Sequence, residues 1–454
     1  MTTRRDFLKN LAIASLATTG LGAVSDLRRI AAAATLQKAE FSDYKALVCL
    51  FMYGGNDANN MVIPTSATEF AQYQGPRGVL ALPRASVLPI TITNTPGREF
   101  ALHPAMPHLA QVVNTGRAAI VANVGPLLAP TTRAQWQNRS VPLPMNLFSH
   151  SDQQGQWQSA ISDEAPRSGW GGRIGDLLKD ANGTNTSSTL ISVAGNNLWE
   201  NGNTITSYKV SANTGFGISY YKGAAATDPL SRAVNEMLGR PYANVFERTW
   251  VDIISRSIQN QAAMQAALAG ASITTVFPDS GLGDSLQLVA RLIAARGALG
   301  VKRQTFFVSI GGFDTHGDEQ LGRQNELLGE VSAAVRAFYD ATIEMGISQG
   351  VTLFTASDFN RNFPTNGKGS DHAWGSHHFV VGGSVYGGAM YGTFPTLAVN
   401  GPDDAGQGRW IPTTSVDEFG ATLARWFGVA EPDLHTVFPK LSRFARPNLG
   451  FLAV

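Results

Sequence analysis

Residues 45–57 have the sequence Lys-Ala-Leu-Val-Cys-Leu-Phe-Met-Tyr-Gly-Gly-Asn-Asp. The apolar part lacks the alternation of a half-exposed strand and is typical of a parallel strand buried on both faces. Two glycines then end the strand, and Asn56 and Asp57 follow at its carboxyl end. Because open α/β sheets bind ligands beyond the carboxyl ends of their strands, these polar residues lie where a functional site is expected.

Five further apolar runs have the length of buried strands, at 118–124, 189–193, 305–310, 351–355 and 379–381. Helical patterns lie between several of them, for example at Leu328, Val331 and Val335. Ser415-x-x-Glu418 is a capping box that predicts the start of another helix. Strands that alternate with helices predict an α/β fold, an α/β/α sandwich with a mostly parallel central sheet.

The domain organisation follows from what the 454 residues lack. There is no internal repeat and no proline-rich linker, which favours a single α/β domain at 45–454 over three small domains. Two helical segments, roughly 229–238 and 242–269, interrupt the order of strands and helices. The prediction is a helical insertion at about 229–299.

Residues 1–34 have the order of a signal peptide. Arg4 and Arg5 form a basic start, an apolar run follows from Leu11 to Val24, and the small residues 31–34 offer a cleavage site. The paired arginines resemble a twin-arginine signal, which predicts a periplasmic or otherwise exported protein that is a partner of the Tat export machinery. The run is shorter than the roughly 20 residues that span a bilayer, so no integral membrane segment is expected after cleavage. An ordinary N-terminal amphipathic helix is the alternative.

The composition excludes several classes of protein. A single cysteine cannot form a disulfide within the chain, and a net charge of +1 offers no basic surface, so no nucleic-acid partner is expected. Cys49 lies in the middle of the first strand, where it is expected to be a small buried hydrophobe. A thiolate-rich metal site is excluded as well, which leaves nitrogen and oxygen atoms as ligands.

Aspartates and histidines follow three of the predicted strands. Four of the eight histidines lie between 316 and 378. Imidazole and carboxylate together are the ligands of zinc, manganese or iron sites, and neighbouring carboxylates need a cation to offset their repulsion. The sequence therefore predicts divalent metal ions, with the ligands drawn from Asp57, Asp314, His316, Asp358, Asp371, His372 and His377. Two of these also have a structural interpretation, Asp57 as a turn residue and Asp314 as a helix cap.

Another motif has the sequence of a serine esterase signature, Gly283-Asp284-Ser285-Leu286. It lies at the start of a predicted helix, so a structural role for it is the better interpretation. The segment from Gly169 to Gly175 is similar to a dinucleotide-binding loop, but its glycine spacing is wrong.

Three motifs in combination resemble a known bacterial family. They are Gly54-Gly55-Asn56-Asp57, Gly311-Gly312-Phe313-Asp314-Thr315-His316, and Asp371-His372 followed by His377-His378-Phe-Val-Val-Gly-Gly. From about Ala46 to the last predicted helix, the chain resembles the family called domain of unknown function 1501, which is grouped with the alkaline phosphatase and sulfatase superfamily.

This resemblance implies an alkaline-phosphatase-like sandwich with two metal ions at the strand ends. Asp57 would bind one ion, and Asp314 and His316 the other, while the remaining aspartates and histidines are ambiguous candidates. The superfamily also needs a hydroxyl nucleophile at a helix N-terminus, for which Ser149 and Ser151 are the candidates. A sulfatase is disfavoured, because neither Cys49 nor Ser140 lies in a C/S-x-P-x-R motif.

The function expected from these features is that of an exported metal-dependent hydrolase of phosphate mono- or diesters. Its substrate would be an anionic small molecule or an anionic group on a polymer. The alternative is a non-catalytic exported binding protein on the same scaffold. A metal-free esterase that uses Ser285 is a third hypothesis.

Overall fold

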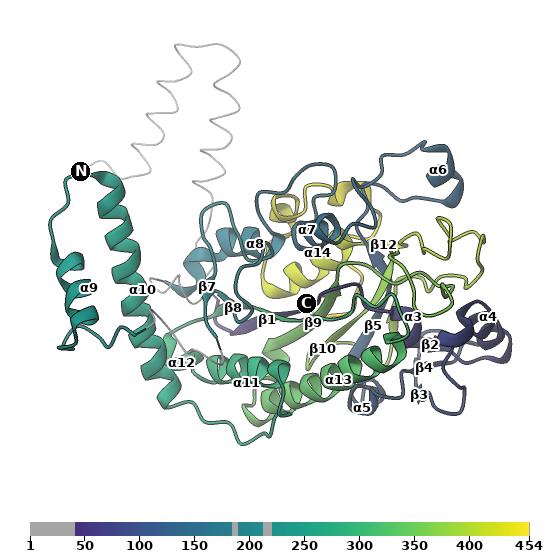
Figure 1. Ribbon diagram of the computed structural model, residues 1–454, viewed down its shortest axis with the longest axis horizontal. Coiled ribbons are helices and arrows are strands. Elements are labelled where there is room, and N and C mark those ends of the chain that lie inside the picture. The colour runs from purple at the N-terminus through teal and green to yellow at the C-terminus, as the bar shows by residue number, and fades with distance from the viewer. Residues whose placement is uncertain (1–40, 184–188, 212–219, 454) are drawn as a thin grey trace, which may run out of the picture. The chain divides into compact units, whose positions relative to one another are not determined.

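A central sheet dominates the residues that the computed structural model describes, which are 41–183, 189–211 and 220–453. Within this part of the chain the sheet has nine strands in the order β11-β5-β10-β9-β1-β8-β6-β7, and the ninth, β12, pairs with β5 (Figure 1). The strands are β1 Lys45–Met52, β5 Ala118–Gly125, β6 Leu190–Ser192, β7 Tyr208–Lys209, β8 Arg303–Ile310, β9 Val351–Ser357, β10 Ser376–Gly382, β11 Met390–Tyr391 and β12 Thr414–Ser415. The signal peptide predicted at 1–34 lies outside the described residues.

The sheet is mostly parallel, as predicted. Among the nine described strands of this sheet, only β10 runs antiparallel to its neighbours, β5 and β9. β1 pairs in parallel with β8 on one side and β9 on the other, so that Val48 lies between Phe306 and Leu353. Its residues from Ala46 to Met52 are buried, which explains the unbroken apolar run. Cys49 is a buried free thiol in this strand, as expected.

Helices cover both faces of the sheet, which confirms the α/β/α sandwich (Figure 1). On one face α13 packs against α5 and α11, and its Leu328, Val331 and Val335 join the same core as Val48 and Leu50 of β1. On the other face Phe354 of β9 lies 5.5 Å from the ring of Trp170 in α8 and 5.7 Å from Phe419 in α14. The α-helices of these layers are α5 Pro107–Asn114, α7 His150–Ser159, α8 Trp170–Leu178, α11 Gly281–Ala294, α13 Gln320–Glu344, α14 Val416–Phe427 and α15 Leu434–Val437.

Smaller elements complete the described fold. β2 Val62–Pro64, β3 Leu88–Ile90 and β4 Phe100–Leu102 form a separate three-stranded antiparallel sheet. Short or peripheral helices are α3 Ala58–Met61, α4 Ala67–Arg77, α6 Arg133–Asn138 and α12 Arg296–Leu299. The predicted capping box is confirmed, because Ser415 accepts from the Glu418 N–H and Glu418 accepts from the Ser415 N–H at the start of α14.

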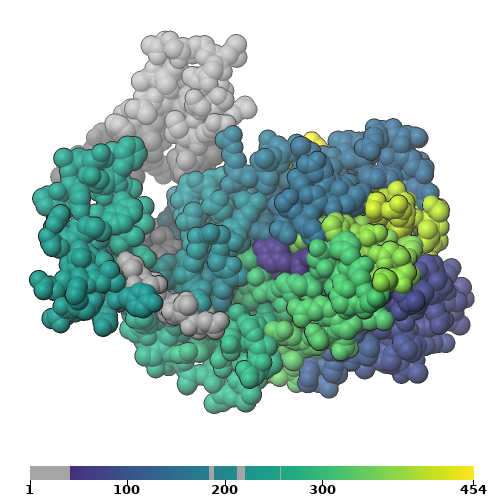
Figure 2. All heavy atoms as spheres, viewed as in Figure 1, coloured from purple at the N-terminus to yellow at the C-terminus, as the bar shows by residue number. Residues whose placement is uncertain are grey.

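Between β7 and β8 the chain forms α9 Pro229–Gly239 and α10 Val245–Ala269, which appear in teal in Figure 2. These helices expose several large apolar side chains, among them Phe246, Trp250 and Ile253. α11, which follows, packs against α13 and β8 and so belongs to the helical layer of the sandwich. No helix in the described part of the chain is both long and apolar enough to cross a membrane.

The Gly54-Gly55 pair lets the end of β1 approach the neighbouring loops. Gly54 has a φ of +111°, and a Cβ atom there would lie 2.4 Å from the backbone nitrogen of Asp314. A Cβ at Gly55 would lie 2.3 Å from the ring of Phe359. The two glycines thus allow the loops after β1, β8 and β9 to meet at one end of the sheet.

Candidate metal centre

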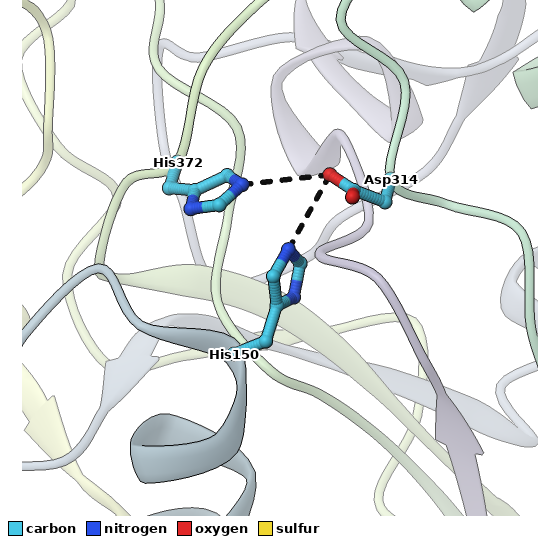
Figure 3. Close-up of side chains that lie close together, drawn as sticks. All are labelled: His150, Asp314 and His372. Atoms are coloured by element: carbon cyan, nitrogen blue, oxygen red, sulfur yellow. Dashed lines mark ion pairs between the residues drawn. The ribbon is translucent and has the colours of Figure 1, made fainter.

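A cluster of histidines and aspartates lies beyond the carboxyl ends of β8 and β9. Asp314 follows β8, His372 lies in the loop between β9 and β10, and His150 is the first residue of α7 (Figure 3). One ligand atom from each of these three residues lies within 4.8 Å of the others. The Nε2 atoms of His150 and His372 are 3.4 and 3.5 Å from Asp314 Oδ1. Three segments that are far apart in the sequence therefore supply one site.

His316 adds a fourth residue, and a third imidazole ring, to the cluster. Its Nε2 lies 2.9 Å from Asp314 Oδ1 and 3.1 Å from His372 Nε2. The side chains of His316 and Asp314 are 44% and 48% exposed, so this part of the cluster is open to solvent. A ligand can reach the cluster from that side.

The other ring nitrogens of the three histidines face hydrogen-bond acceptors. His150 Nδ1 lies 2.7 Å from Asp358 Oδ2, and His316 Nδ1 lies 3.2 Å from Asp371 Oδ1. His372 Nδ1 lies 2.8 Å from the backbone carbonyl of Phe148. Carboxylate and carbonyl oxygens only accept hydrogen bonds, so each Nδ1 must carry the proton. In each neutral ring Nε2 is then an acceptor.

This arrangement directs acceptor atoms at an ionised carboxylate. Burial opposes ionisation of Asp314, but the hydrogen bond and charge of Arg361 outweigh it and hold the pKa of Asp314 below its usual value. Burial lowers the pKa of His372, whereas the hydrogen bond to Asp358 raises the pKa of His150. Neutral imidazole nitrogens beside a carboxylate oxygen repel one another unless a proton or a metal cation lies between them.

The spacing of the donor atoms fits a transition metal. In a tetrahedral zinc site with bonds of about 2.0–2.1 Å, the ligand atoms lie about 3.3 Å apart. The four distances among Asp314 Oδ1 and the facing Nε2 atoms range from 2.9 to 3.5 Å. The Nδ1 contacts to Asp358, Asp371 and Phe148 correspond to the outer partners that orient histidine ligands in metal sites. His150, Asp314, His316 and His372 therefore form a chemically suitable set of ligands.

Arg361 holds the loops around this cluster in place. Its buried guanidinium donates to Asp314 Oδ1 at 2.9 Å and to the Thr315 carbonyl at 2.8 Å, and it also bonds the carbonyls of Gly54 and Ser370. One side chain thus links the loops after β1, β8 and β9. It fixes the orientation of Asp314 and compensates its charge on one side.

Asp57 does not join the cluster, although the sequence makes it a candidate ligand. Its Oδ2 accepts hydrogen bonds from Arg77 and, at 2.8 Å, from Gln320 Nε2. The side chains of Asp57 and Arg77 are both fully buried. The positive charge that Asp57 needs is therefore supplied by the protein itself.

His377 is also placed away from the cluster. It lies in β10, where its Nδ1 accepts from the backbone N–H of Asn123 at 3.0 Å and its ring stacks on Phe394. Burial lowers the pKa of His377 to about 3. Strand alternation sends this side chain into the core rather than toward the loop that carries His372.

The remaining candidates surround the cluster. Asp358 and Asp371 lie behind His150 and His316, as described above. Ser149 and Ser151 flank His150 at the start of α7, and Ser149 Oγ donates to Asp152 Oδ2 at 2.5 Å. Ser285 lies on α11, where its hydroxyl donates to the Gly281 carbonyl at 2.8 Å.

Sequence reasoning missed two residues of this site, His150 and Arg361. His150 lies between the two serines that were singled out, so an inspection of polar residues at that helix start would have found it. Arg361 follows β9 by only a few residues, but no local sequence motif distinguishes an arginine that links three loops from an ordinary surface arginine. Its role follows from long-range contacts alone.

The fold and the cluster together define an α/β protein with a candidate metal centre of histidine and aspartate at the strand ends. The chain matches the family described as "Protein of unknown function (DUF1501)" over residues 44–431 and belongs to this family. No curated protein matches the chain.

Several solved structures are similar over most of the chain. The PsFucS1 sulfatase from Pseudoalteromonas sp. has 12% identity and a TM-score of 0.33, covering 90% of this chain and 71% of that one. The zinc complex of the C-terminal periplasmic domain of EcEptC from Escherichia coli has 10% identity and a TM-score of 0.35, covering 92% and 94%. A protein in the alkaline phosphatase superfamily from Vibrio parahaemolyticus has 11% identity and a TM-score of 0.31, covering 87% and 73%.

Proposed function

We propose that this protein is a metal-dependent hydrolase of phosphate mono- or diesters that uses one transition-metal ion, zinc or manganese. The observation that carries the proposal is the convergence of three imidazole Nε2 atoms on Asp314 Oδ1 at 2.9–3.5 Å, with each facing Nδ1 hydrogen-bonded to an acceptor. His150, Asp314, His316 and His372 would hold the ion. When bound, such an ion supplies a Lewis acid for a phosphoryl oxygen.

The residues of the chain supply the rest of the chemistry. Arg361 keeps Asp314 ionised and oriented, and Asp358 and Asp371 fix the rings of His150 and His316. The N-cap residue of helix α7, Ser149, makes no side-chain cap hydrogen bond, and a helix N-terminus favours a bound anion. The positive end of this helix therefore lies beside His150, where an anionic substrate would bind.

Ser149 is the proposed nucleophile. Its hydroxyl is already hydrogen-bonded to Asp152, whose pKa is lowered by the hydrogen bonds from Asn146 and Ser149. In the proposed first step Ser149 Oγ bonds to phosphorus as the ester P–O bond breaks, and the Ser149 proton passes through Asp152 to the leaving oxygen, which departs as the alcohol. In the second step water attacks the phosphorus of the phosphoserine, the bond to Ser149 Oγ breaks, and a proton from that water returns to Ser149 as the phosphate is released. Ser151 is the more exposed serine and lies 3.3 Å from Ser149 Oγ.

An esterase assay with and without a chelator tests the proposal. The purified protein should hydrolyse phosphate mono- or diesters, lose that activity when the metal is removed, and regain it when zinc or manganese is added back. Activity that persists after complete removal of the metal would contradict the proposal. Metal binding with no hydrolysis of any ester would favour the non-catalytic binding protein instead.

The same assay distinguishes the two serines. Ser149→Ala should lower the rate at least about a hundredfold, because the nucleophile is lost. Ser151→Ala, the matched control, should change it less than about tenfold. Equal and small effects of both substitutions would show that water, not a serine, attacks the ester.

We also propose that residues 1–34 direct export by the twin-arginine pathway. Cell fractionation tests this with Arg4 and Arg5 both replaced by lysine, which should leave the full-length chain in the cytoplasm. The matched control replaces Arg28 and Arg29, the other arginine pair of the segment, by lysine, and this variant should still be exported. Export of both variants at the normal level would contradict the proposal.

A further inference from the structure

Arg409 lies against two of the segments that build the metal centre. Its Nε donates to the backbone carbonyl of His372 at 3.0 Å. Its guanidinium carbon lies 4.4 Å from the ring centroid of Phe148, the residue whose carbonyl faces His372 Nδ1. The positive end of Arg409 is therefore positioned beside the cluster, between the start of α7 and the loop of His372.

Among the described residues, the terminal N–H groups of Arg409 are free to bind a ligand, whereas those of Arg361 are not. Arg361 uses both terminal nitrogens on Asp314 and on backbone carbonyls, so it has little capacity for a ligand. Arg409 is only partly buried, and within the described ranges its two terminal nitrogens have no hydrogen-bond partner. The four N–H groups on these nitrogens are therefore available to a ligand. They form a planar fork that matches the oxygen atoms of phosphate or sulfate.

The loop that carries Arg409 is fixed by hydrogen bonds. The buried carboxylate of Asp404 accepts from the backbone N–H groups of Gly406 and Arg409, at 2.7 and 2.9 Å. The Ala405 carbonyl accepts from Trp136 Nε1 at 2.6 Å. An arginine held from both its backbone and its Nε loses less entropy when it binds an anion than a free surface arginine would.

We propose that Arg409 binds the non-bridging oxygens of the phosphoryl group that the metal centre acts on. This deepens the proposed function and rests on it for the identity of the reacting group. The site contains the carboxylates of Asp314, Asp358 and Asp371, which repel an anionic substrate. Arg409 counters that repulsion with free donors at the edge of the cluster, and it is a substrate-binding residue rather than a metal ligand.

Binding of inorganic phosphate and of inorganic sulfate, measured by calorimetry on the metal-loaded protein, tests this inference. Arg409→Gln should weaken the binding of the preferred anion at least about tenfold. Arg409→Lys keeps the charge but not the fork and should have an intermediate effect. Arg248→Gln is the matched control, because Arg248 is an exposed arginine on α10. Comparison of the two anions shows whether the site prefers phosphate or sulfate.

Metal content and thermal unfolding separate this inference from the function on which it rests. The expected result is weaker anion binding by Arg409→Gln, with metal content and melting temperature unchanged. Unchanged anion affinity, or a loss of metal through displacement of His372, would overturn the role of Arg409. Absence of metal from the wild type would refute the proposed metal centre, whereas the anion measurement would still report on Arg409.

Discussion

Replacement of Asp314 by asparagine should lower the hydrolysis of phosphate esters at least about a thousandfold. Asp314 Oδ1 is the atom on which His150, His316 and His372 converge, so the substitution removes the only anionic ligand of the set. Loss of the cation removes several kcal/mol of transition-state stabilisation, and each 1.4 kcal/mol or so corresponds to a factor of ten in rate. The measurement is kcat/KM with a phosphate ester at saturating zinc or manganese.

Asp318→Asn is the matched control for this substitution. Asp318 lies in the same loop and is exposed, and among the described residues its one ion pair is with the exposed Lys368, at 3.2 Å. Its replacement should change the rate less than about twofold. The assignment of Asp314 would be refuted if its variant kept the activity of Asp318→Asn under the same conditions.

Asp57→Asn, the same chemical change beyond the end of another strand, should lower stability but leave metal binding intact. Asp57→Asn should lower the free energy of unfolding by about 3–5 kcal/mol, because Arg77 then remains buried without its charged partner. The metal should be retained, since Asp57 is bonded to Arg77 and Gln320 rather than placed in the cluster. Denaturant unfolding measures the first effect, and metal analysis measures the second.

A second substitution tests the physical reason. Addition of Arg77→Met to Asp57→Asn removes the unpaired buried charge, so the double variant should recover part of the lost stability. Asp318→Asn, which breaks an exposed pair, should cost less than about 1 kcal/mol. An Asp57→Asn protein of normal stability that lacks metal would show that Asp57 is a ligand after all.

The sheet could be predicted from the sequence because its strands are buried on both faces. An unbroken apolar run such as 45–52 identifies a strand without knowledge of its neighbours. The short strands β7, β11 and β12 have only two residues each, and their pairing depends on where the chain returns to the sheet edge. Local pattern does not contain that information.

The candidate site was predictable where its residues directly follow strands or cluster in one loop. Asp314, His316 and His372 meet that condition, and the structure brings them together. Asp57 also follows a strand, but Arg77, twenty residues later, pairs with its carboxylate. Similarly, the direction of the His377 side chain depends on where β10 begins. Because side chains alternate along a strand, the start at Ser376 directs the His377 ring into the core.

Metal analysis of the purified protein tests the central claim most directly. The wild type, Asp57→Asn and Asp314→Asn are loaded with zinc or manganese, freed of unbound ion, and compared. The wild type and Asp57→Asn are predicted to hold about one ion per chain, and Asp314→Asn almost none. A wild type without bound metal, or an Asp314→Asn protein with its full complement, would contradict the account.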